Sequence, residues 1–263
     1  MAQYQGLMLA TRHGDIAAYL AQPWRGGEHP LVIMLHGALR SAGVLGGWAE
    51  RLAGIADVAL LDLPGHGRSA VPPEASVAAM TEIVAEAIAT GFPDRRAVLV
   101  GESLGGTIGL ALGGMDDPGP VRAVFAADPP ITTTKLWSVH GNFRKLMGQG
   151  PGETFVDRLA RDTFGMTADG LTEIVYYPLI GALKLPAVIA TGDVPLQPPR
   201  PLSKPTSLFD GVDQFVASEL YPGKVTVERI ADTGHLLLLE APDRCLEIIQ
   251  RMLAEHVGEP SPA

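Results

Sequence analysis

Continuous apolar runs alternate with amphipathic stretches along most of this 263-residue chain. The clearest run, Leu-Val-Ile-Met-Leu at residues 31–35, is typical of a strand that is buried on both faces of a parallel sheet. Other runs predict an antiparallel hairpin over 7–11 and 16–21, strands near 56–61, 97–100, 121–126, 187–191 and 225–230, and helices near 44–53, 75–90, 104–113, 208–220 and 242–256. The alternation predicts an α/β fold, a mostly parallel sheet with helices on both faces.

Two segments depart from the alternation. Between residues 129 and 185, aromatic residues are scattered among charges and glycines without a strand-like run, which indicates a cap inserted into the sheet domain. Residues 195–205 contain five prolines, a composition that is incompatible with a regular helix or a central strand and favours an extended loop. We therefore expect residues 1–128 and 186–263 to form one core and residues 129–185 to form a small cap.

One predicted strand-to-helix junction carries the pattern Gly-x-Ser-x-Gly, as Gly-Glu-Ser-Leu-Gly at residues 101–105. In a nucleophile elbow the tight turn exposes the serine Oγ, and the flanking glycines admit neighbouring backbone that a side chain would block. The pattern therefore predicts Ser103 as a nucleophile. A tetrahedral intermediate also needs donors for its negative oxygen, and the predicted pair is the amides of Leu104 and of Ala38, which follows the strand at 31–35.

A histidine that follows an acid in chain order would complete such a site. His235 lies between a predicted strand and the last predicted helix, so it is the predicted base. We expect the acid in the turn after the preceding strand, where a Thr-Gly-Asp run ends at Asp193. Asp128, which follows the strand at 121–126, is the rival acid; we favour Asp193 because a glycine precedes it.

Other polar residues near these segments have a structural interpretation. We expect His36 to hold the loop after its strand, and Asp62 and His66 to order the Pro-Gly-His-Gly turn at residues 64–67. Glu102 flanks the nucleophile, but the geometry of an elbow points it away, which leaves a local structural or electrostatic effect. Cys245 is the one cysteine, and we interpret it as a small buried apolar residue.

Composition excludes several classes of function. The formal net charge of −9 and the absence of a Lys/Arg cluster disfavour nucleic acid and polyanionic substrates. The scattered histidines predict no catalytic metal, and the lack of a Gly-x-Gly-x-x-Gly fingerprint predicts no dinucleotide cofactor. The first residues lack the features of a signal peptide, and no apolar run approaches the roughly 18 residues of a spanning helix, so we expect a cytoplasmic protein. The sequence does not determine the oligomeric state.

Five segments together resemble the α/β-hydrolase superfamily, in particular its serine-nucleophile, esterase- and lipase-like branch: Leu35-His36-Gly37, Asp62–Gly67, Gly101–Gly105, Thr191–Asp193 and Thr233–His235. The resemblance covers most of the chain outside the predicted cap. It implies an eight-stranded, mostly parallel sheet whose second strand is antiparallel, a cap after the sixth strand, and no cofactor. Two features depart from the family pattern: the proline-rich segment lengthens the stretch between the predicted acid and the base, and the cap is short.

The predicted chemistry is attack of Ser103 on an acyl carbonyl, with His235 as base and Asp193 orienting it, followed by release of the acyl group by water. A serine nucleophile disfavours the aspartate-nucleophile branches of the superfamily, such as haloalkane dehalogenases and epoxide hydrolases. We expect a carboxylic ester hydrolase with a small-molecule acyl substrate. A thioesterase, a lactonase or a carbon–carbon bond hydrolase would use the same residues, and a slow-turnover ligand receptor with this fold is the alternative from another class.

Overall fold

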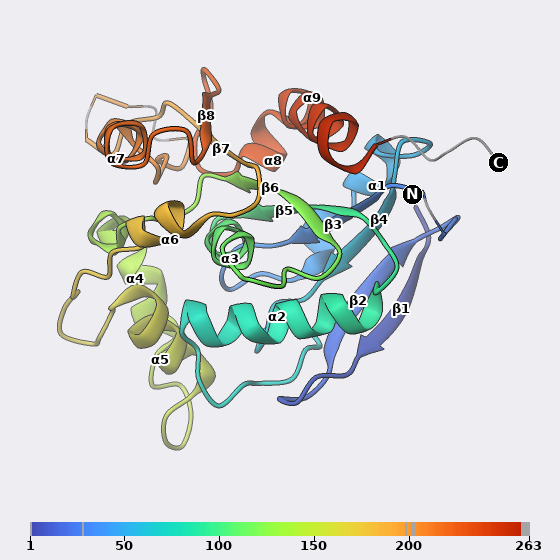
Figure 1. Cartoon of the computed structure of the whole chain (residues 1–263). Coiled ribbons are helices and arrows are strands. Elements are labelled where there is room, and N and C mark those ends of the chain that lie inside the picture. The colour runs from blue at the N-terminus through green and yellow to red at the C-terminus, as the bar shows by residue number, and fades with distance from the viewer. Residues whose placement is uncertain (1, 28, 198, 201–202, 259–263) are drawn as a thin grey trace.

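A sheet of eight strands runs through the centre of the computed structural model, which describes residues 2–27, 29–197, 199–200 and 203–258 (Figure 1). The strands are β1 (Tyr4–Leu9), β2 (Ile16–Ala21), β3 (Leu31–Leu35), β4 (Asp57–Leu61), β5 (Ala97–Glu102), β6 (Val121–Ala127), β7 (Ala187–Thr191) and β8 (Thr226–Arg229). Their order is β1-β2-β4-β3-β5-β6-β7-β8. β2 is antiparallel to both of its neighbours and the other pairs are parallel, which confirms the predicted sheet.

Helices cover both faces of this sheet (Figure 1). In β3, Leu31, Ile33 and Leu35 belong to one buried apolar cluster, and Val32 and Met34 belong to the other. A strand that is apolar on both faces must be covered on both, as the sequence predicted. The first cluster includes α2 (Val77–Gly91), α3 (Leu104–Gly113) and α7 (Gly211–Leu220); the second includes η1 (Ala42–Leu45), α1 (Trp48–Arg51), α8 (Leu237–Glu240), α9 (Pro242–Met252) and η4 (Leu253–Val257).

The segment between β6 and β7 is helical and lies at one end of the sheet (Figure 1). It comprises η2 (Thr133–Leu136), α4 (Trp137–Leu146), α5 (Phe155–Arg158), η3 (Leu159–Thr163) and α6 (Tyr177–Ala182). Its buried Phe143, Leu159 and Phe164 join the apolar cluster that includes α2 and α3. The predicted division into a core and a cap at residues 129–185 stays a prediction, because this segment shares its apolar core with the sheet domain.

Strand register brings two turns to the same edge of the sheet. Glu102 pairs with Ala127, and Ala127 pairs with Ala190, so β5, β6 and β7 end side by side. The amide of Ser103 donates to Ala127 O at 2.9 Å, and the amide of Asp128 donates to Ala190 O at 2.8 Å. The residues that directly follow β5 and β6 are therefore neighbours at the carboxyl edge, where open α/β sheets bind their ligands.

None of the helices in the described part of the chain is long and apolar enough to cross a membrane.

Candidate active site

Ser103 occupies a strained turn between β5 and α3. Its φ of 56° and ψ of −119° lie in a region that non-glycine residues rarely adopt, and such strain concentrates at functional sites. A Cβ on Gly101 would lie 2.2 Å from Gly105 O, and a Cβ on Gly105 would lie 2.6 Å from Leu35 O. Only glycine fits at either position, so the local structure is that of the elbow indicated by the sequence.

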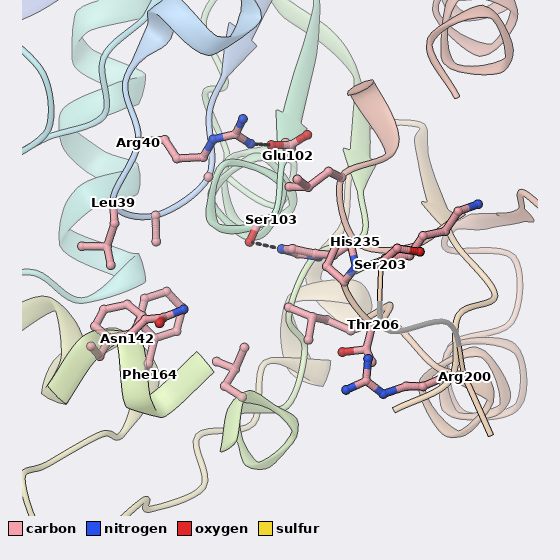
Figure 2. A pocket seen from close by; sticks show the side chains of 18 residues that line it. Leu39, Arg40, Glu102, Ser103, Asn142, Phe164, Arg200, Ser203, Thr206 and His235 are labelled. Atoms are coloured by element: carbon pink, nitrogen blue, oxygen red, sulfur yellow. Dashed lines mark hydrogen bonds and ion pairs between the residues drawn. The ribbon is translucent and has the colours of Figure 1, made fainter. Parts of the chain in front are cut away.

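His235 lies in the loop between β8 and α8 and bridges two side chains. Its Nε2 is 3.0 Å from Ser103 Oγ (Figure 2), and its Nδ1 is 2.7 Å from Asp128 Oδ2. A carboxylate only accepts hydrogen bonds, so Nδ1 carries the proton and Nε2 accepts from the serine hydroxyl. Glu240 fixes the loop, since its two carboxylate oxygens accept from Gly234 N at 2.9 Å and from Leu236 N at 3.1 Å.

The structure corrects the acid predicted from the sequence, because the residue against His235 is Asp128 and not Asp193. The Asp193 carboxylate lies 3.8 Å from Arg229 Nη2, and 24% of its side chain is exposed. Asp128 directly follows β6, the neighbour of the strand that precedes Ser103, whereas Asp193 follows β7, one strand further away. The rival acid of the sequence analysis is therefore the one that the fold brings to the histidine.

Asp128 is fully buried and receives several hydrogen bonds. Its Oδ1 accepts from Thr191 Oγ1 at 3.1 Å, from Phe209 N at 3.1 Å and from Ser207 Oγ, and its Oδ2 accepts from Leu208 N at 2.7 Å. An isolated buried carboxylate is costly, and these donors stabilise its charge and fix its orientation toward the imidazole.

Three of these donors belong to residues 207–209, which were not predicted from the sequence as site residues. They follow the proline-rich segment, whose residues 198, 201 and 202 lie outside the described part of the chain. The extra length between Asp193 and His235 was the sequence signal for this segment. The path that returns it to Asp128 was not visible in the sequence, because two of the three donors are backbone amides, whose donation does not depend on residue type.

A buried charged cluster anchors the segment that supplies these donors. Lys135 pairs with the fully buried Asp213 of α7, and its Nζ lies 2.9 Å from Asp210 Oδ1. The hydroxyl of Tyr177 donates to Asp213 Oδ1 at 2.6 Å. Burial raises the pKa of Asp213, while the hydrogen bonds from Lys135 and Tyr177 favour its charged form. Lys135 and Tyr177 belong to the helical segment between β6 and β7, so the cluster ties that segment to α7.

Of the two amides predicted as an oxyanion hole, that of Leu104 directly follows Ser103, and that of Ala38 belongs to a neighbouring turn. The loop with Ala38 lies close to the nucleophile, since a Cβ on the adjacent Gly37 would be 3.2 Å from Ser103 Cβ. Leu104 is the first residue of α3, where backbone amides have no acceptor within the helix. Among the described backbone contacts, neither amide has an acceptor.

His36 holds this loop in place, as the sequence predicted, and Asp62 links it to the residues after the Pro-Gly-His-Gly turn. His36 is fully buried; its Nε2 accepts from Leu63 N at 3.0 Å, so its Nδ1–H donates to Gly37 O at 2.7 Å. Burial lowers the pKa of His36 to about 4, so the ring is neutral at neutral pH. Asp62 accepts from Ala42 N at 2.7 Å, Arg68 N at 2.9 Å and Tyr19 Oη at 3.0 Å.

A cavity of about 600 Å³ includes Ser103 and His235 in its lining (Figure 2). The helical segment contributes an apolar wall of Leu136, Phe143 and Phe164, and the two rings pack with their centroids 5.2 Å apart. The other wall includes Arg200, Ser203, Lys204 and Thr206 from the loop after β7. The described part of the proline-rich loop therefore borders the candidate active site.

Glu102 and Arg40 form an ion pair at the edge of this cavity (Figure 2). Glu102 is almost fully buried, and burial raises its pKa, while the charge of Arg40 acts in the opposite direction. The carboxylate accepts a hydrogen bond from Arg40 and none from Ser103. This agrees with the local electrostatic effect expected for Glu102.

The described part of the chain contains neither a cluster suited to a metal ion nor a reactive thiol. Within the described ranges, no group of three or more His, Cys, Asp or Glu side chains is arranged to hold a metal ion. Cys245 is buried, and burial raises the pKa of its thiol to about 12, so it is protonated and unreactive at neutral pH.

Parts of the sequence are similar to curated bacterial proteins named pimeloyl-[acyl-carrier protein] methyl ester esterase. The chain is 45% identical over 113 residues to the protein from Chromobacterium violaceum, and 36% identical over 111 residues to one from Xanthomonas campestris pv. campestris. Each alignment covers 42% of this chain and 42% of the relative. The matched part therefore spans less than half the length of these relatives.

Solved structures match over nearly the whole chain. E-2-(acetamidomethylene)succinate hydrolase aligns with a TM-score of 0.71 and 19% identity, over 95% of this chain and 99% of that one. Carboxylesterase CesB (YbfK) from Bacillus subtilis aligns with a TM-score of 0.65 and 16% identity, over 96% and 91%. At such identities these likenesses show the fold alone. The model of the alpha/beta hydrolase family matches residues 32–248, from β3 into α9, and this chain belongs to that family.

Proposed function

We propose that this protein is a serine hydrolase that cleaves carboxylic esters through an acyl-enzyme on Ser103. The observation that carries the proposal is the hydrogen-bonded line from Ser103 Oγ to His235, 3.0 Å, and from His235 to Asp128, 2.7 Å, at the wall of a cavity. Relatives named as methyl ester esterases support the ester class over lactones and carbon–carbon bonds.

The proposed reaction has two steps on the same residues. His235 removes the proton of Ser103 as Oγ attacks the ester carbonyl, and Asp128 keeps the imidazole in the correct tautomer and stabilises the imidazolium. The amides of Ala38 and Leu104 donate to the negative oxygen of the tetrahedral intermediate. His235 then protonates the leaving alcohol, and a water molecule, deprotonated by the same histidine, releases the acid and restores the serine.

The cavity favours a small or medium apolar group next to the scissile bond. Its volume of about 600 Å³ is within the usual range for small-molecule sites, and the wall from Leu136, Phe143 and Phe164 is apolar. In this proposal the segment at residues 129–185 acts as the cap that shapes the substrate site. The substrate is a small acyl ester, and no cofactor takes part.

Hydrolysis of p-nitrophenyl esters from acetate to octanoate tests the proposal. The wild type is expected to hydrolyse at least the shorter esters, and Ser103→Ala is expected to lower kcat by about 10⁶-fold because the nucleophile is lost. Ser218→Ala, on the exposed face of α7, is the matched control and should behave like the wild type. Mass spectrometry after treatment with a fluorophosphonate should locate the covalent adduct on Ser103. Equal turnover by wild type and Ser103→Ala, or an adduct elsewhere, would contradict the proposal.

A further inference from the structure

Among the described residues, two arginines and one lysine line the cavity of the candidate active site, and two of these three side chains have a partner. Arg40 pairs with Glu102, and Lys204 donates from its Nζ to the carbonyl oxygen of Asp232. Arg200, by contrast, has neither a hydrogen bond nor an ion pair with any residue in the described ranges. The lining therefore contains one arginine whose charge is not matched by a described neighbour.

Arg200 lines the same cavity as the nucleophile Ser103. Figure 2 shows Arg200 and Arg40 on opposite sides of Ser103, with Arg200 extending from the loop after β7 toward the cavity. Glu102 is the one carboxylate in the described lining, and it is bonded to Arg40 on the other side. No acidic side chain of the lining is thus placed to neutralise Arg200.

The surroundings of Arg200 favour an anion over water. Its side chain is partly buried, and the cavity that it borders also has the apolar wall of Phe143 and Phe164. Coulombic attraction strengthens where water is partly excluded, and the planar guanidinium fork matches carboxylate and phosphate oxygens. The protein carries a net charge of −9, so an unmatched cation at the cavity is a local feature and not part of a generally basic surface.

We propose that Arg200 is an anion-binding subsite, and that the preferred substrate is an acyl ester with a carboxylate or phosphate group at the far end of its acyl chain. The scissile carbonyl would lie at Ser103, and the chain would follow the apolar wall. This inference rests on the proposed ester hydrolysis and adds a substrate class to it. The anion selects the substrate and takes no part in the chemical step.

Esters that share a six-carbon acyl chain and differ at its far end measure this selectivity. p-Nitrophenyl hydrogen adipate carries a terminal carboxylate, p-nitrophenyl adipamate carries an uncharged amide in its place, and a terminal phosphate ester of p-nitrophenyl 6-hydroxyhexanoate separates phosphate from carboxylate recognition. In the wild type, kcat/KM should be higher for at least one anionic ester than for the amide. Arg200→Gln should lower that ratio about tenfold, as expected for loss of a hydrogen bond to a charged group, and Arg200→Lys should retain part of it.

Lys204→Gln is the matched control, because it removes a cation from the same loop that is already engaged with a carbonyl oxygen. It should leave the ratio within about twofold of the wild type, because an exposed charge that already has a partner contributes little to binding. An unchanged ratio in Arg200→Gln, or an equal fall in Lys204→Gln, overturns the subsite.

A binding measurement separates failure of the subsite from failure of the proposed reaction. Calorimetric titration of Ser103→Ala with the same esters requires no turnover. Tighter binding of an anionic ester than of the amide, lost in Ser103→Ala/Arg200→Gln, supports the subsite even if the wild type hydrolyses neither ester. Equal binding of anionic and neutral esters overturns it even if hydrolysis is efficient.

Discussion

The turns after β6 and β7 both place an aspartate at the carboxyl edge of the sheet, but in contrasting surroundings. Asp128 is fully buried, accepts hydrogen bonds from four groups besides His235, and lies 2.7 Å from the imidazole. The side chain of Asp193 is partly exposed, and its one ion-pair partner among the described residues is Arg229, at 3.8 Å. The comparison indicates that neighbouring donors and strand position, more than the local sequence motif, decide which carboxylate serves the histidine.

The glycine before Asp193 has a packing role that explains the motif. A Cβ on Gly192 would lie 2.3 Å from Thr233 O, so only glycine allows this close approach. The amides of Asp193 and Val194 both donate to the same carbonyl oxygen, at 2.9 and 3.1 Å. The Thr-Gly-Asp sequence thus positions the loop of the histidine through backbone contacts, without using the carboxylate.

Asp128→Asn should show the largest loss of activity. A small loss would contradict the contrast drawn between Asp128 and Asp193. An amide cannot stabilise the imidazolium and favours the wrong tautomer, so kcat for a p-nitrophenyl ester should fall by about 10⁴-fold. Circular dichroism and the urea midpoint should show that the variant is folded. A fall of less than tenfold would mean that Asp128 does not orient His235.

Asp213→Asn tests whether the buried cluster is needed to anchor the segment that serves Asp128. The substitution leaves Lys135, which is 13% exposed, with Asp210 alone, and loss of one partner of a buried pair costs about 3 kcal/mol of unfolding free energy. Urea denaturation measures the change. Arg229→Gln, which breaks the exposed pair with Asp193, is the control and should change the free energy by less than about 1 kcal/mol. Equal losses of unfolding free energy in Asp213→Asn and Arg229→Gln would contradict a special role for the buried cluster.

Ser207→Ala removes one hydrogen-bond donor to Asp128 and tests whether these donors orient the acid. Loss of a hydrogen bond to a charged group should lower kcat about tenfold, with little change in KM, because the acid is oriented less well. Ser207→Thr keeps the hydroxyl and should recover most of the rate. If alanine and threonine variants lost activity equally, or if only KM changed, the hydroxyl would not position the acid.

Asp193→Asn should have the smallest effect. Its carboxylate does not contact His235, and its pairing with Arg229 is solvent-exposed, so kcat should stay within about twofold of wild type and stability within about 1 kcal/mol. Ester kinetics and urea denaturation in parallel with the Asp128 variant check this. A large loss of kcat here would restore the acid predicted from the sequence.

The sequence predicted the sheet well because its signals are local. Runs such as residues 31–35 are apolar on both faces, and the Gly-x-Ser-x-Gly pattern of the elbow at Ser103 lies within five consecutive residues. The choice of acid depends on contacts between Asp128 and residues 207–209, which are distant in sequence. Two of those donors are backbone amides. No residue pattern in the sequence therefore indicates that the chain comes back to Asp128 after the proline-rich loop.

The most direct test is the downfield region of the proton NMR spectrum. A histidine Nδ1–H that donates a hydrogen bond to a buried carboxylate resonates there. The wild type and Asp193→Asn should both show this signal at low temperature, and His235→Gln should lack it, which assigns it. Asp128→Asn should abolish the signal if Asp128 is the partner of His235. Retention of the signal in Asp128→Asn together with its loss in Asp193→Asn would contradict the account.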